Sequence, residues 1–180
     1  MVEVDEEPTA SDLEKMSTLR PAFEKEGTIT AANASKINDA AAVLMLASEE
    51  AVKKYNLKPL ARVVSSACHA QEPKWFSTAP APAMQKALSK ANLAIKDIDL
   101  FEINEAFALV TLAAMRKLDI PHDKVNIHGG ACALGHPLGA SGAQILTTLI
   151  HALHTQDKKY GLASLCIGGG EGIALIVERI

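Results

Sequence analysis

One histidine lies in a loop built mostly of glycine and other small residues. The stretch 126–142 reads NIHGGACALGHPLGASG and places His136 between Gly135 and Pro137. The Ser-Gly pair at the end of this stretch opens a long apolar segment of helical character. A loop that delivers an imidazole and ends at a helix N-terminus suits a polarised or anionic oxygen. The alternative is a tight connection between a strand and a helix, in which His136 only caps the chain.

A thiol and an amide follow two other apolar runs. Cys166 lies near the end of YGLASLCI (160–167), and three glycines (168–170) come next. Asn104 opens the motif NEAF directly after the apolar run 98–103. Open α/β sheets place their chemistry at the C-terminal ends of their strands, so we expect the amide, the imidazole and the thiol at one edge. The glycines leave backbone N–H groups free to point into such a site.

These segments together resemble the C-terminal half of a thiolase, most closely one of the acetyl-CoA C-acetyltransferase (acetoacetyl-CoA thiolase) type. The motifs NEAF, GHPLGASG and CIGGG-x-G follow the family's order and spacing, and TAANASKINDAAA (30–42) is a fourth match. The similarity extends over residues 27–180. The resemblance implies thiolytic cleavage of acetoacetyl-CoA or Claisen condensation of two acetyl-CoA molecules. The substrate is then a coenzyme A thioester, and no cofactor is required.

The resemblance also assigns roles to individual residues. Cys166 is the acid/base, while His136 and the backbone N–H of Gly168 stabilise the thioester oxygen as it gains charge. Asn104 positions a water or an oxygen without adding charge. In the family the histidine also activates a nucleophilic cysteine, which belongs to the N-terminal half. That half is the expected partner, and the chain alone is expected to be inactive.

The other two cysteines stand outside the family's nucleophile motif. Three cysteines are an odd number without metal-ligand spacing, which indicates free thiols in a reducing compartment. We expect Cys68 to be a small core residue. We expect Cys132 to line or support the glycine loop without reacting.

Small residues before the predicted helix at 39–55 allow a flat ligand chain to lie against the backbone. The resemblance assigns Ser35 a hydrogen bond to the pantetheine of coenzyme A, with Ala31 and Phe107 at the same binding site. Helix capping is the alternative for Ser35. Phe107, like Glu105 beside it, also suits a structural role. Mitochondrial-type relatives bind potassium through backbone carbonyls here, which implies a potassium site on the following residues: Ala31, Ala32 and Ala34.

Two adjacent aromatic residues, Trp75 and Phe76, stand between prolines in a chain with only 4% aromatic residues. They can form a lid on the core or a wall of the acyl pocket, and the resemblance places Phe76 in the pocket. Ser77 departs from the proline of the mitochondrial type, so the preference for branched acyl groups stays open.

Composition limits the class of protein. The chain has 180 residues, 48% of them apolar, and a net charge of −3, which gives no electrostatic argument for nucleic acid. It contains no apolar run of the ~20 residues that a membrane span needs. The resemblance implies a homodimer or homotetramer in lipid metabolism. The expected compartment is the cytoplasm or the mitochondrial matrix, and the cytoplasm in a bacterium.

The expected elements alternate as β-α-β-α-β-α-β-β. This order predicts a mixed five-stranded sheet, mostly parallel with a final antiparallel strand, and helices on both faces. We expect residues 1–35 to be the tail of a covering loop region and residues 36–180 to form the C-terminal domain. The predicted strands are 60–67, 98–103, 125–127, 160–167 and 173–178, and the predicted helices are 39–55, 82–91, 105–118 and 141–154.

Two other functions were weighed against the thiolase interpretation. A ketoacyl synthase relative would share the fold, but it would need a second histidine where Cys166 stands. A non-catalytic module that binds coenzyme A or a lipid is favoured only by the missing nucleophile. The set of Asn104, His136 and Cys166 argues against it.

Overall fold

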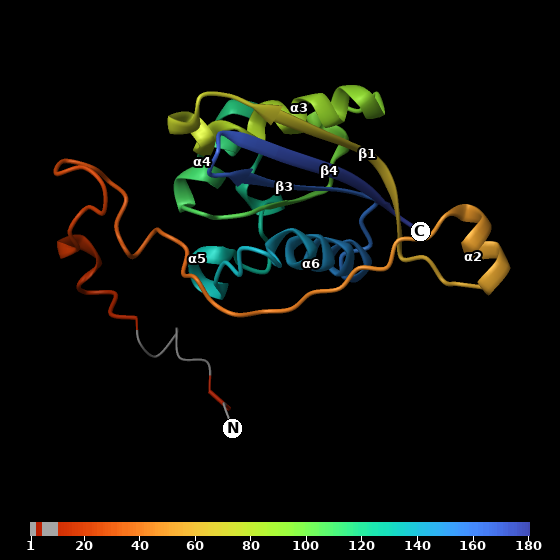
Figure 1. Ribbon diagram of the computed structural model, residues 1–180, viewed down its shortest axis with the longest axis horizontal. Helices are drawn as coiled ribbons and strands as arrows, with labels where there is room; N and C mark the ends of the chain where they lie inside the picture. Colours follow the sequence, from red (N-terminus) through yellow and green to blue (C-terminus); the bar gives the residue numbers. More distant parts are fainter. Residues whose placement is uncertain (1–2, 5–10) are drawn as a thin grey trace.

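Four strands form one sheet with helices on both faces (Figure 1). The structure, a computed structural model, describes residues 3–4 and 11–180; the remainder of the expected tail, residues 1–2 and 5–10, lies outside this description. The strands are β1 (Ala61–Ala70), β2 (Leu100–Ile103), β3 (Tyr160–Ile167) and β4 (Glu171–Arg179). The α-helices are α2 (Glu49–Tyr55), α3 (Pro80–Ala91), α4 (Ala108–Leu118), α5 (Ala131–Leu134) and α6 (Ser141–Thr155). Short 3-10 turns are η1 (Met16–Thr18), η2 (Pro73–Thr78), η3 (Ile95–Asp97) and η4 (His122–Lys124).

The sheet has the order β1-β4-β3-β2. Strand β4 runs antiparallel to β1 and β3, while β2 and β3 are parallel. Three strands therefore share one direction, and their C-terminal ends meet at one edge. The α/β class, the mixed sheet and the antiparallel last strand are confirmed.

The predicted fifth strand at 125–127 is wrong. Val125 makes only an isolated parallel bridge to Phe101. The next residue, Asn126, has φ 48°, so the backbone leaves the extended conformation after one pairing. The side chain of Asn126 then pairs with the edge of β2. Its Oδ1 accepts from the N–H of Ile103 at 2.8 Å, and its Nδ2 donates to the Ile103 carbonyl at 2.9 Å. One carboxamide thus replaces the backbone of a strand.

The predicted helix at 39–55 is correct only for its last part. Ser48 caps α2, because its Oγ accepts from the N–H of Ala51 at 3.1 Å. The chain before Ser48 is extended and runs past α5 and α6 (Figure 1, orange). The apolar residues of this segment fit the spacing of a helix or of a strand. A helix here would need another surface to cover its apolar face. Four large side chains of this segment are at least 78% exposed: Ile37, Val43, Met45 and Leu46.

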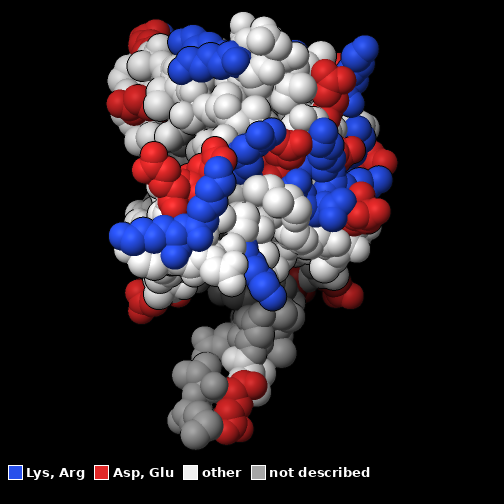
Figure 2. Space-filling view, turned by 90° about the vertical axis from the view of Figure 1, so that its right-hand side faces the viewer, with Lys and Arg blue, Asp and Glu red and all other residues white. Residues whose placement is uncertain are grey.

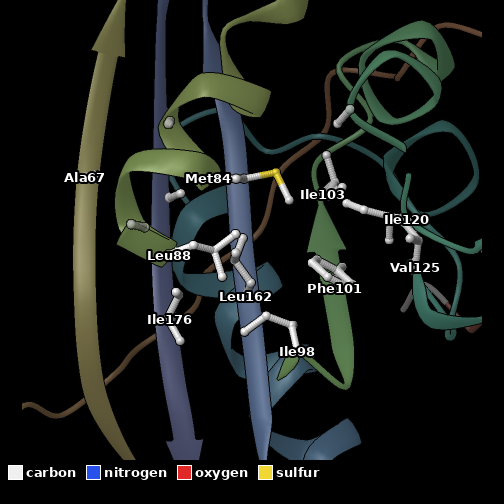
Figure 3. Close-up of a cluster of buried hydrophobic side chains, with 14 of the residues drawn as sticks. Ala67, Met84, Leu88, Ile98, Phe101, Ile103, Ile120, Val125, Leu162 and Ile176 are labelled. Carbon is white, nitrogen blue, oxygen red and sulfur yellow. The ribbon is translucent and has the colours of Figure 1, made fainter. Parts of the chain in front are cut away.

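The larger part of the core lies between the sheet and α3. Met84 and Leu88 of α3 pack with Phe101 of β2, Leu162 of β3 and Ile176 of β4 (Figure 3). On the opposite face α6 contributes a second cluster with Leu149 and Leu153 at its centre. Each fully buried side chain of this size contributes ~1.5–3 kcal/mol. The two clusters fix β2 and β3 from both sides, and these are the strands that carry Asn104 and Cys166.

Cys68 is not a core residue, contrary to the prediction. Strand β1 alternates between its two faces, so Ala67 points into the core while its neighbour Cys68 is exposed. No helix in the described part of the chain is long and apolar enough to cross a membrane.

The end of the sheet opposite Asn104 and Cys166 carries charges of both signs. Figure 2 shows Lys and Arg interspersed with Asp and Glu on this face. Glu178 at the end of β4 pairs with Arg62 and with Lys159, and Arg179 pairs with Asp157. A surface of mixed sign offers no basic stripe to a nucleic acid here.

Candidate functional site

Parallel pairing of β2 and β3 brings Asn104 and Cys166 to one edge of the sheet. Ile103 lies opposite Ser164, and the N–H of Asn104 extends the ladder by donating to the Ser164 carbonyl at 2.9 Å. Cys166 follows two positions later on β3. The amide and the thiol therefore come from neighbouring strand ends, as expected.

The glycine loop brings His136 against Asn104. The Nδ2 of Asn104 lies 3.4 Å from Nε2 of His136, and Nδ1 of the same ring lies 2.6 Å from Oγ of Ser141. The Ser141 hydroxyl in turn donates to the carbonyl of Pro137 at 2.9 Å. Two of the three expected residues are thus in direct contact, and Ser141 holds the ring from behind.

These contacts define the protonation of the ring. Because the Ser141 hydroxyl proton goes to Pro137, Oγ accepts a hydrogen bond from Nδ1–H of His136. The Asn104 amide can only donate through Nδ2, so Nε2 presents its lone pair. Burial lowers the pKa of His136, which favours the neutral ring. The neutral imidazole therefore rests with Nε2 as its basic nitrogen, whose lone pair accepts from Asn104.

Cys166 is buried at the opposite side of the same edge. It is 8% exposed and belongs to the apolar cluster with Leu162 and Ile176. Burial raises the pKa of its thiol, so the thiol is protonated at neutral pH. No hydrogen bond joins Cys166 to His136 in the part of the chain that the structure describes. Their convergence stays a prediction.

The turn after Cys166 leaves space at Gly168. A Cβ built at Gly168 would meet no atom within 4 Å, so nothing crowds the backbone there. The turn itself closes with the N–H of Gly170 donating to the carbonyl of Ile167 at 3.1 Å. A backbone donor at Gly168 stays a prediction.

Glu105 ties the NEAF motif to the glycine loop. Its carboxylate accepts from the N–H of Cys132 at 3.1 Å and from Nδ2 of Asn126 at 3.3 Å. A Cβ at Gly130 would lie 2.3 Å from this carboxylate, so any larger residue there would displace the Glu105 side chain. Burial, with the Glu105 charge and hydrogen bond, raises the pKa of Cys132 to about 11. These contacts support a structural Glu105 and an unreactive Cys132.

Ser35 and Lys36 are hydrogen-bonded to the NEAF motif and to the glycine loop. The N–H of Ser35 donates to the Ala106 carbonyl at 3.1 Å, and the N–H of His136 donates to the Lys36 carbonyl at 2.7 Å. Ser35 precedes no helix, because α2 begins at Glu49. The capping alternative is therefore wrong, while the pantetheine contact of the half-buried Ser35 stays a prediction.

Phe107 is the middle ring of three. Its centroid lies 6.3 Å from that of Phe76 and 5.6 Å from that of Phe23, both in edge-on geometry. Phe76 is half-buried against the core, while Trp75 is 55% exposed. The two adjacent aromatics thus have different environments. Phe23 was missed because its charged surroundings show no periodicity.

Two positioning residues were also missed. Ser141 does begin a helix, as predicted, but its contact with the His136 ring was not predicted. The available signal is its position five residues after the histidine. Asn126 looked like part of a strand, and nothing in its local pattern indicates that its side chain bonds Ile103.

The implied potassium site has only part of its ligands here. Carbonyl oxygens suit a hard cation, which takes about six or more of them. Three carbonyls from one turn at Ala31, Ala32 and Ala34 do not complete such a shell. The described residues also contain no cluster of three His, Cys, Asp or Glu side chains that could hold a metal.

Known proteins show the same combination of segments. Residues 57–179 match the family described as "Thiolase, C-terminal domain", and residues 1–50 match "Thiolase, N-terminal domain". An acetyl-CoA acetyltransferase of Escherichia coli is 54% identical over 177 residues, which cover 98% of this chain and 45% of that protein. A probable acetyl-CoA acetyltransferase of Dictyostelium discoideum is 51% identical over 98% of this chain and 42% of its own length.

Solved structures agree with these matches. The acetyl-CoA acetyltransferase of Bacillus anthracis superposes with a TM-score of 0.90 at 48% identity, over 93% of this chain and 42% of that one. A human mitochondrial 3-ketoacyl-CoA thiolase in complex with CoA superposes with a TM-score of 0.87 at 46% identity, over 94% of this chain and 43% of that one. The chain thus spans less than half the length of these relatives.

Proposed function

Because the chain belongs to the thiolase family, we propose that it supplies the C-terminal half of an acetyl-CoA C-acetyltransferase. The reaction is thiolytic cleavage of acetoacetyl-CoA or, in reverse, Claisen condensation of two acetyl-CoA molecules. The observation that carries the proposal is the contact between Asn104 and His136, with the ring held by Ser141. It leaves Nε2 as the basic nitrogen of the ring.

His136 serves two steps in turn. Its Nε2 accepts the proton of a nucleophilic cysteine thiol, and the resulting thiolate attacks the thioester carbonyl. Nε2–H then donates to the oxygen that gains negative charge, with the Gly168 N–H as a donor for a second such oxygen. Ser141 keeps the ring in this orientation throughout. Asn104 positions a water or the oxygen without adding charge.

Cys166 is the acid/base of the second site. Its protonated thiol can give a proton to the leaving thiolate of coenzyme A, and the Cys166 thiolate can then remove a proton from the methyl group of acetyl-CoA. Burial raises the pKa of this thiol, which suits the acid role in the resting state. The glycine turn beside it supplies N–H dipoles that favour the thiolate when it forms.

The channel for coenzyme A passes the segment that lies along the NEAF motif. Ser35 contacts the pantetheine, with Ala31 beside it, and the rings of Phe76 and Phe107 line the acyl end. The backbone hydrogen bond from Ser35 to the Ala106 carbonyl supports this position of the segment. Potassium at Ala31, Ala32 and Ala34 is a further proposal, and no step above depends on it.

The nucleophilic cysteine is proposed to lie in an N-terminal half outside these 180 residues. That half is the partner of this chain, in a homodimer or homotetramer of the cytoplasm or the mitochondrial matrix. The division into a covering tail at 1–35 and a C-terminal domain at 36–180 stays a proposal; the two family matches meet between residues 50 and 57.

A chimera tests the function. The part of the Escherichia coli relative that precedes its matched region is joined to this chain, and thiolysis of acetoacetyl-CoA is measured. We expect activity in the chimera and its loss in the matched chimera with His136→Ala, both with parental circular dichroism. A folded chimera without thiolysis, together with a free chain that binds coenzyme A by calorimetry, would favour the non-catalytic module instead.

A further inference from the structure

Glu102 is a buried carboxyl group with no role in the reaction proposed above. It is 5% exposed, in a strand whose four residues are all buried. Phe101 and Ile103 belong to the cluster on the α3 face. Because side chains alternate along a strand, Glu102 shares the other face with Asn104. This face is covered by α6.

A small cavity lies between Glu102 and the functional loop. It measures about 30 Å³, and Glu102, Asn104, Gly130, Gln144 and Thr148 contribute to its lining. A cavity of this size can hold one water molecule, and an ordered water there needs about two to four polar partners. The carboxyl, the two amides and the threonine hydroxyl meet that requirement. Polar side chains thus stand among apolar ones in the lining, and the space is large enough for one water molecule.

We propose that Glu102 is a positioning residue: through one water molecule bound in this cavity, its carboxyl group fixes the carboxamide of Asn104 so that Nδ2 faces His136. A carboxamide can flip end for end, and only one orientation donates to the ring. When Nδ2 faces His136, the Oδ1 of Asn104 needs a donor on the cavity side. The inference rests on the proposed function, which gives the Asn104–His136 contact its purpose.

The charge state of Glu102 fits this arrangement. Burial, and then the charge of Glu105, raise the pKa of Glu102 to about 8, so the group is a carboxylic acid with an O–H donor at neutral pH. The titratable groups nearby are Glu105, Cys132 and His136 on the two loops. Gln144 and Thr148, which α6 turns toward the cavity, are neutral. Above pH ~8 the donor becomes a carboxylate and the preference for one amide orientation weakens.

Nuclear magnetic resonance on the whole 180-residue chain tests the proposal between pH 7 and 9.5. The signals followed are the Glu102 carboxyl carbon, the Asn104 side-chain N–H₂ group and the His136 ring nitrogens. His136 titrates below this window, because burial lowers its pKa, and Cys132 titrates near 11. We expect the Asn104 and His136 signals to shift together with the Glu102 carbon, with one midpoint near 8.

Two variants separate positioning from mere burial. Glu102→Gln keeps a donor but cannot titrate, so its Asn104 and His136 signals should stay at the parent's low-pH positions throughout. Glu72→Gln, on an exposed carboxylate, should titrate as the parent does. Parent signals of Asn104 that ignore the Glu102 titration would overturn the proposal, even if Glu102→Gln failed to fold. Activity of the chimera does not enter, so this inference can fail while the proposed function stands.

Discussion

The side chain of Asn126 bonds the N–H and the carbonyl of Ile103, at 2.8 and 2.9 Å. Ile103 is fully buried and immediately precedes Asn104. The carboxamide therefore holds the strand end from which the amide of Asn104 projects. A buried backbone group without a partner costs ~1–3 kcal/mol. The N–H of Ile103 depends on this side chain, while the Ile103 carbonyl also accepts from Oγ1 of Thr111 at 3.1 Å.

Removing that side chain should destabilise the chain strongly. We expect Asn126→Gly to lower the free energy of unfolding by ~1–3 kcal/mol, because glycine keeps the backbone at φ 48° and removes the partner of the Ile103 N–H. Asn126→Ala should cost more, since it adds backbone strain. Urea unfolding measures both. A loss below ~0.5 kcal/mol in Asn126→Gly would show that water replaces the amide without cost.

Asn126 also marks where sequence reasoning reaches its limit. Apolar runs at 98–103 and 160–167 predicted two neighbouring strands, and pairing of their ends follows from parallel topology alone. The position of Asn104 and Cys166 at neighbouring strand ends could therefore be predicted from the sequence. The run at 125–127 has the same apolar character, but its pairing ends at Asn126, whose backbone is in the left-handed region. The sequence does not reveal this backbone conformation, which becomes visible only in the structure. The prediction of a helix before Ser48 failed for another reason. The apolar pattern of this segment fits a helix packed on a surface, and the part of the chain that the structure describes contains no surface that covers it.

Gly135 has a left-handed backbone conformation that strains any other residue. Its φ is 91°, and a Cβ there would lie 2.4 Å from Oδ1 of Asn38. We expect Gly135→Ala to cost ~1–3 kcal/mol in unfolding free energy and to displace the segment bonded to the loop. The amide of His136, which donates to Lys36 at 2.7 Å, should then exchange its hydrogen at least about tenfold faster. Gly139→Ala is the control, because a Cβ at Gly139 meets nothing within 4 Å.

The three thiols should differ in their reaction with iodoacetamide. Cys68 is exposed and should be alkylated first at pH 7.5. Cys132 and Cys166 should react much more slowly, because burial raises the pKa of both thiols and leaves little thiolate. Mass spectrometry of the peptides at timed intervals gives the order, and unfolded chain in urea should show three similar rates. Fast labelling of Cys166 in the folded chain would mean that its thiol is activated without the N-terminal half.

Glu102 predicts how stability depends on pH. Its pKa rises from an ordinary 4.5 to about 8 on folding, so the folded state holds a proton that the unfolded state has lost between these values. Stability is therefore full below pH 4.5 and declines as pH rises toward 8. Between pH 5.5 and 8.5 the parent should lose on the order of 3 kcal/mol relative to Glu102→Gln, which cannot titrate. Parallel urea curves for the two proteins would contradict the raised pKa.

The division of labour between Cys166 and His136 is tested in the chimera by measuring acyl transfer and condensation separately. Cys166→Ser should spare formation of the acyl-enzyme more than condensation, because the nucleophile lies elsewhere while deprotonation of the methyl group needs a base. A serine hydroxyl is far less acidic than a thiol, so general-base catalysis worth ~10²–10⁴-fold should be largely lost. His136→Ala should impair both half-reactions, because Nε2 serves the nucleophile and then the oxygen.

Asn104→Ala removes one oriented donor and should cost ~10²–10³-fold, less than loss of the base. Ser141→Ala keeps every reacting group and removes only the acceptor of Nδ1–H, so it should change the tautomer of His136 and slow both half-reactions less than His136→Ala does. If Cys166→Ser condensed acetyl-CoA at the parent rate, its thiol would be a bystander. If Cys166→Ser instead abolished acyl-enzyme formation and left condensation from preformed acyl-enzyme intact, Cys166 itself would be the nucleophile.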